Sequence, residues 1–154
     1  MKEIDEFDLI RCKYQADFFE YATDKMKANS ASFIKAFANS TLAKLMDKEE
    51  FIFESLDIER AYEELIKEKS IRSTDKQYSA EIMSWIGYLL RYWSIYHNTS
   101  TQNIYKIIKP EELNRIYEAY HSLDVTEAID RILDAKKINY NLNNVEILKK
   151  IYML

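Results

Sequence analysis

The run Trp85-Ile86-Gly87-Tyr88-Leu89-Leu90-Arg91-Tyr92-Trp93 contains both tryptophans of the chain and its only glycine. Around it, apolar residues recur at helical spacing, at Ile82, Trp85, Ile86, Leu89, Trp93 and Tyr96. This wide apolar face predicts a Trp-rich helix, capped by Ser79, at the centre of the core. Glycine inside a helix costs about 1 kcal/mol relative to alanine, so we expect another helix to cross closely at Gly87.

The rest of the chain predicts a compact, all-α, multi-helix bundle. Glycine and proline occur once each, and apolar residues again recur at helical rather than alternating spacing. The first helix is expected over residues 4–26, with one apolar stripe and a charged far face. That stripe comprises Phe7, Ile10, Tyr14, Phe18 and Tyr21. Further helix starts are expected at Ser30, Ser40, Asp57, Ser100, Pro110 and Asp124, the last with the spacing of a capping box to Glu127. The run Phe51-Ile52-Phe53 is ambiguous.

Length and the asparagine-rich stretch near residue 140 suggest one domain with an appendage. The 154 residues suit a single helical domain, which we expect over 1–138. Residues 139–144 read as a linker, and the following apolar stretch up to 154 predicts a short helix. This tail carries four lysines and one acid from Lys136 onward. It either adds a last helix to the core or inserts into a partner groove.

Composition excludes several classes of function. One cysteine and two histidines cannot build a disulfide framework or a structural zinc site, and we expect no metal or cofactor. The chain has no apolar stretch long enough to span a membrane and its first residues lack the pattern of a signal peptide, so we expect a cytoplasmic protein. A net charge of −4 disfavours nucleic-acid binding. Residues 47–69 hold nine acids against four bases, which is either a solvated face or a surface for a basic partner.

One pair of residues suggests chemistry. Arg91 is followed after five residues by His97, which is similar to the spacing in helical HEPN ribonucleases. An arginine steadies phosphate charge and a histidine moves protons during RNA cleavage. The structural alternative is that Arg91 pairs with an acid in the core while His97 is a solvated residue at a helix end. For His121 and Cys12 we expect structural roles.

Three blocks of the sequence resemble a family of small helical bacterial proteins. They are 33–37 with 40–47 (FIKAF, STLAKLMD), then Trp85-Ile86-Gly87-Tyr88 with Arg91-Tyr92-Trp93, and 105–113 with 120–124 and 128–133 (YKIIKPEEL, YHSLD, AIDRIL). The resemblance covers residues 5–137. It implies a gene in a toxin-antitoxin-like operon, beside an ADP-ribosyltransferase-like toxin, and no catalytic motif.

A non-catalytic, protein-binding role follows from that resemblance. We expect an antitoxin that binds and neutralises a partner toxin, with Tyr88, Arg91 and Tyr92 as its recognition face, because they lie off the apolar stripe of their helix. The same three residues could instead pack against a neighbouring helix. Two other hypotheses remain open, namely an RNA-cleaving toxin that uses Arg91 and His97, and a structural subunit that forms a homodimer.

Overall fold

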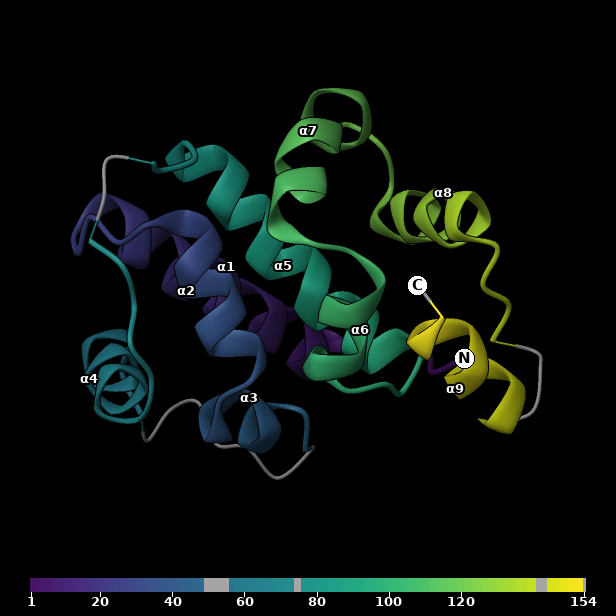
Figure 1. Cartoon of the computed structure of the whole chain (residues 1–154), viewed down its shortest axis with the longest axis horizontal. Coiled ribbons are helices and arrows are strands. Elements are labelled where there is room, and N and C mark those ends of the chain that lie inside the picture. The colour runs from purple at the N-terminus through teal and green to yellow at the C-terminus, as the bar shows by residue number, and fades with distance from the viewer. Residues whose placement is uncertain (49–55, 74–75, 141–143, 154) are drawn as a thin grey trace.

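Helices make up all regular secondary structure in the residues that the computed structural model describes, which are 1–48, 56–73, 76–140 and 144–153. In chain order they are α1 (Glu6–Asp24), α2 (Ser30–Ala38), α3 (Thr41–Met46), α4 (Ile58–Glu68), α5 (Ala80–Tyr96), α6 (Thr101–Ile107), α7 (Pro110–Tyr120), α8 (Val125–Lys136) and α9 (Asn144–Tyr152). The predicted all-α bundle is confirmed (Figure 1). The ambiguous run 51–53 lies outside the described residues. Within them, none of the helices combines the length and the apolar character needed to cross a bilayer.

Local capping fixes most helix starts where the sequence predicts them. The side chains of Ser40, Asp57, Ser79 and Ser100 each accept a hydrogen bond from the backbone N–H three residues on. The prediction for Ser30 is wrong, because Asn29 caps α2. The Ser30 hydroxyl is buried and accepts instead from the backbone N–H of Tyr78 at 2.8 Å. The Ser30 hydroxyl therefore serves a contact with a residue far along the chain, and not the cap of its own helix.

Two further caps differ from the sequence prediction in detail. Asp124 does cap α8, but its carboxylate accepts from the backbone N–H and the hydroxyl of Thr126, at 3.0 and 2.7 Å. The reciprocal capping box occurs at α1, between Asp5 and Asp8.

Helices α1 and α5 cross closely at Gly87. A Cβ atom placed on Gly87 would lie 2.6 Å from the carbonyl oxygen of Gln15 and 2.9 Å from the Phe19 ring. The Gln15 side-chain Nε2 donates to the Gly87 carbonyl at 3.0 Å across the same crossing. The expected crossing at the glycine is confirmed. Beyond α1, helix α5 also contacts α6, α7 and α8.

An aromatic cluster joins α1, α2 and α4 beside this crossing. Phe18 meets Phe33, Phe37 and Tyr62 edge to face, with ring centroids 5.4, 5.7 and 6.5 Å apart. Such arrangements contribute about 0.5–1.5 kcal/mol per pair beyond the area that they bury. Tyr62 thereby fixes α4 to the flank of α1 and α2.

The apolar stripe predicted for α1 is wrong over its first half. Phe7 and Ile10 are 72% and 46% exposed. The buried face of the helix includes Asp8, Arg11, Cys12, Gln15, Phe18, Phe19 and Ala22. The inner face is partly polar because α1 supplies hydrogen-bond partners to buried charges on other elements.

The C-terminal helix α9 packs on α6. Ile151 is 3% exposed, and the Lys106 ammonium donates to the Tyr152 hydroxyl at 3.1 Å. Of the two alternatives for the tail, this placement is the one that adds a helix to the core.

The glycine crossing generates a stability prediction. Gly87→Ala would gain about 1 kcal/mol in helix propensity but overpack the crossing at a cost of about 1–3 kcal/mol. Since the obstructing atom is a backbone oxygen, we expect a net loss in the free energy of unfolding, measured by urea titration. Ser84→Ala, a nearby substitution in the same helix, is the control. A variant at Gly87 as stable as the wild type would contradict a tight crossing.

Candidate functional site

The three residues predicted to form a recognition face do not share one surface. Tyr88 and Tyr92 are partly exposed and stacked, with ring centroids 6.3 Å apart, and Tyr92 continues to Tyr96 at 5.9 Å. Arg91 is completely buried. Arg91 therefore cannot present its guanidinium to a partner in this fold, whereas partner contact through the two tyrosines stays a prediction.

Arg91 instead joins four elements inside the core. Its Nη1 donates to Asp47 Oδ1 at 2.8 Å, and its Nε donates to Gln15 Oε1 at 2.8 Å. The other nitrogen, Nη2, donates to the Thr101 hydroxyl at 3.2 Å. Asp47 also accepts from the backbone N–H of Thr101 at 3.1 Å, so that this carboxylate holds the start of α6. A guanidinium suits this position because its planar donors reach several acceptors at once.

The two residues of the RNA-cleavage hypothesis have different surroundings, and they do not contact the same partners. Arg91 has its donors engaged in the core, while the His97 ring lies at the end of α5, stacked on Tyr140 with centroids 4.4 Å apart. His97 is half-buried rather than solvated, and its buried Nε2 has no hydrogen-bond partner among the residues that the structure describes. Burial, assisted by the N-terminal ammonium, lowers the pKa of His97 to about 4. Because the Arg91 guanidinium has no exposed surface, it cannot contact a phosphate beside His97 in this fold, and the two residues do not form a phosphate-cleaving pair.

Cys12 and His121 lie in surroundings that fit the structural roles expected for them. Cys12 is fully buried, and burial raises its pKa to about 12. His121 caps α7 at its C-terminal end, where its Nδ1 lies 2.8 Å from the Tyr117 carbonyl oxygen.

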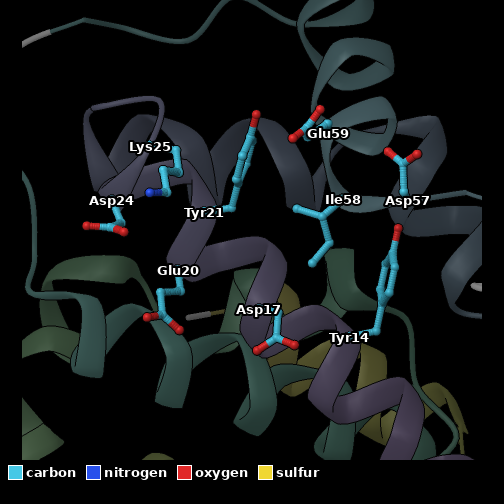
Figure 2. Close-up of a pocket in the computed structure, with 9 residues that line it drawn as sticks. All are labelled: Tyr14, Asp17, Glu20, Tyr21, Asp24, Lys25, Asp57, Ile58 and Glu59. Carbon is cyan, nitrogen blue, oxygen red and sulfur yellow. The ribbon is translucent and has the colours of Figure 1, made fainter.

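The strongest candidate for a binding site is a groove between α1 and α4. It has a volume of about 980 Å³. Its lining residues are Tyr14, Asp17, Glu20, Tyr21, Asp24, Lys25, Asp57, Ile58 and Glu59. Figure 2 shows Tyr14 and Tyr21 rising from α1 toward α4, where Ile58 lies beside two of the carboxylates. We call this feature the acidic groove.

The walls of the acidic groove are held in place by hydrogen bonds and by a contact between two rings. The Tyr14 hydroxyl donates to the Leu56 carbonyl at 2.6 Å, which fixes the chain just before α4. Asp57 then caps α4 by accepting from the Arg60 backbone N–H at 2.8 Å. Tyr21 packs edge to face on Tyr62, with centroids 5.8 Å apart. The two tyrosines are therefore pre-positioned, which lowers the entropy cost of using them as binding anchors.

The groove combines aromatic surface with strong negative charge. Five carboxylates line it against the single ammonium of Lys25. Burial, followed by the charges of Glu59, Glu63 and Asp57, raises the pKa of Tyr21. Burial, with a contribution from Asp57, raises that of Tyr14 to about 12. Both phenols therefore stay neutral at neutral pH. This arrangement suits a cationic, partly apolar chain segment. The tyrosine rings can contact the methylene groups of a lysine or arginine side chain, and the carboxylates can contact its charged end.

The carboxylates of the groove do not gather at one point. In the part of the chain that the structure describes, no three side chains among the histidines, cysteines, aspartates and glutamates converge in a way that would hold an ion. The carboxylates are spread along two helices, an arrangement that suits the binding of an extended segment.

Sequence reasoning identified only half of this site. The acidic character of the segment that contains Asp57 and Glu59 was recognised, whereas the contribution of α1 was missed. A signal was present, because Asp17, Glu20 and Asp24 recur at spacings of three and four and so share one side of a helix.

Comparison of the chain with known protein families, with curated proteins and with solved structures finds no match.

The Arg91–Asp47 pair generates a prediction about stability. Arg91→Ala leaves Asp47 without its charge partner and should lower the free energy of unfolding by about 3–5 kcal/mol in urea titrations. In the Arg91→Ala background, Asp47→Ala should lower the free energy of unfolding by much less than the same substitution does in the wild type, because the two residues act as a unit. The exposed pair Lys67–Glu64, at 3.2 Å, is the matched control and should show a coupling of at most about 1 kcal/mol. Additive losses at Arg91 and Asp47 would contradict the network.

The depressed pKa of His97 predicts a pH dependence of stability. The unfolded chain protonates this ring near pH 6.5, whereas the folded chain does so only near pH 4. Unfolding therefore takes up a proton between these values, and the free energy of unfolding should fall as pH drops through that window. His97→Phe keeps an aromatic ring against Tyr140 and should flatten the dependence, measured as urea midpoints against pH. An unchanged slope in His97→Phe would refute the assignment.

Proposed function

We propose that this chain is the non-catalytic, protein-binding member of a toxin-antitoxin-like pair, and that its acidic groove receives a basic segment of the partner toxin. The observation that carries the proposal is the groove between α1 and α4, where pre-positioned tyrosines lie among five carboxylates.

The composition of the groove supports protein recognition on physical grounds. Binding energy at interfaces concentrates in a few buried aromatic or arginine anchors, and tyrosine offers a large contact area with few rotatable bonds. Complementary charge around such anchors speeds the encounter and rejects acidic competitors. Tyr14 and Tyr21 supply the anchors here, and the carboxylates supply the charge.

The nature of the partner comes from the resemblance of residues 5–137 to a family of operon-encoded helical proteins. That resemblance supports a toxin encoded beside this chain, of the ADP-ribosyltransferase-like type. Tyr88 and Tyr92 are a second surface for the same partner, because both are partly exposed on α5.

The proposal predicts that charge reversal in the groove disables neutralisation. The variant Glu20→Lys with Asp24→Lys changes two lining residues that have no role in a helix cap. Co-expression of the wild-type chain with the toxin of the neighbouring gene should restore growth, and the two proteins should co-purify. The double variant should weaken the complex by at least about tenfold and lose the rescue, since like charges at an interface cost several kcal/mol.

A matched control separates the groove from net charge. Glu118→Lys with Asp130→Lys reverses one glutamate and one aspartate on the exposed sides of α7 and α8, and it should rescue growth like the wild type. Failure of the wild-type chain both to rescue and to co-purify would reject the antitoxin role. Loss of binding in Tyr92→Ser, with full binding by the groove variant, would move the contact surface to the tyrosines of α5.

A further inference from the structure

The outward side of α9 is apolar and basic. Leu148, Tyr152 and Met153 are 42%, 67% and 84% exposed, and Lys149 is exposed among them. Leu148, Lys149 and Tyr152 lie on one face of α9, and Met153 follows directly after its end, while Ile147 and Ile151 lie on the other face toward the core. We call Leu148, Lys149, Tyr152 and Met153 the tail face.

Neighbouring charges make the tail face more positive. Lys106 of α6 donates to the Tyr152 hydroxyl and lies 4.3 Å from the centre of its ring. Lys150 is also exposed and donates to the Lys137 carbonyl at 3.0 Å. Glu146 is the only acid in α9. A lysine stem beside a tyrosine and two flexible apolar side chains is the kind of segment that the acidic groove accommodates.

The tail face and the acidic groove are at opposite ends of the molecule. Helix α4 lies near one end of the longest axis and α9 near the other (Figure 1). A single copy therefore cannot place its own tail face in its own groove. Two copies can form this contact, provided that the end of one molecule that carries α9 meets the end of the next molecule that carries α4.

We propose that copies of this chain associate head to tail, with the tail face of one copy seated in the acidic groove of the next. The inference rests on the same groove as the proposed function. Such a contact joins two different surfaces, so each added copy leaves one groove and one tail face open, and the assembly grows rather than stopping at a dimer. The toxin and a second copy then compete for the groove.

The experiment measures the mass of the purified full-length chain by light scattering over a range of concentrations. At about 0.01 M salt, where the Debye length is roughly 30 Å, the average mass should rise past that of a dimer with concentration. At about 1 M salt, where the length is roughly 3 Å, the rise should shrink. Groove variant Glu20→Lys with Asp24→Lys and tail variant Lys149→Glu with Met153→Glu should each stay monomeric, with association at least about tenfold weaker.

Mixing the two variants provides the decisive arm. The lysine-bearing groove accepts the glutamate-bearing tail, and the unchanged groove accepts the unchanged tail, so the mixture should assemble although neither variant does alone. Zero-length cross-linking of mixed-isotope copies should join Lys149 of the wild type to an acidic-groove carboxylate of another copy. Glu118→Lys with Asp130→Lys should assemble like the wild type, and circular dichroism verifies that each variant is folded.

Several results would overturn the inference. A monomer at every concentration in low salt would do so, as would a dimer that forms equally in both variants, which is the signature of a symmetric interface elsewhere. If the chain stays monomeric while the groove variant still loses the toxin, head-to-tail association fails and the proposed function stands. If assembly follows the variants but toxin rescue does not, the groove serves self-association alone.

Discussion

The burial of one guanidinium constrains the whole architecture. Arg91 carries a full positive charge into a site with no exposed surface, and an uncompensated ion there would cost several kcal/mol. The fold compensates it with Asp47 at the end of α3, Gln15 of α1 and Thr101 of α6. These partners lie on different elements, so satisfying one charge fixes how α1, α3, α5 and α6 meet. The approach of α1 to α5 at Gly87 brings Gln15 within reach.

The same constraint explains which predictions from the sequence succeeded. Helix caps at Ser40, Asp57, Ser79 and Ser100 depend on contacts within three residues, and a local pattern is enough to predict them. The glycine crossing was also predictable, because an unfavourable residue in an otherwise apolar helix needs a packing reason.

The inner face of α1 was not predictable from periodicity, because a buried charge far along the chain decides it. Hydrophobic spacing assigned Phe7 and Ile10 to the core, whereas the structure turns Gln15 and Arg11 inward and exposes the two apolar side chains. Arg11 donates to the Met46 carbonyl at 2.9 Å, next to the residue that pairs with Arg91. The groove shares this non-local character, since its two walls are separated by more than thirty residues.

The thiol of Cys12 gives this architecture a built-in reporter. It is the only cysteine of the chain and lies on the buried side of α1, among the residues that face α5. Burial raises the pKa of this thiol to about 12, so the folded protein carries very little of the reactive thiolate at pH 7, and burial also keeps reagents away from the sulfur. Alkylation of the folded protein must therefore wait until α1 separates from its neighbours. The rate of thiol labelling then measures how often the contact between α1 and α5 opens, without any introduced probe.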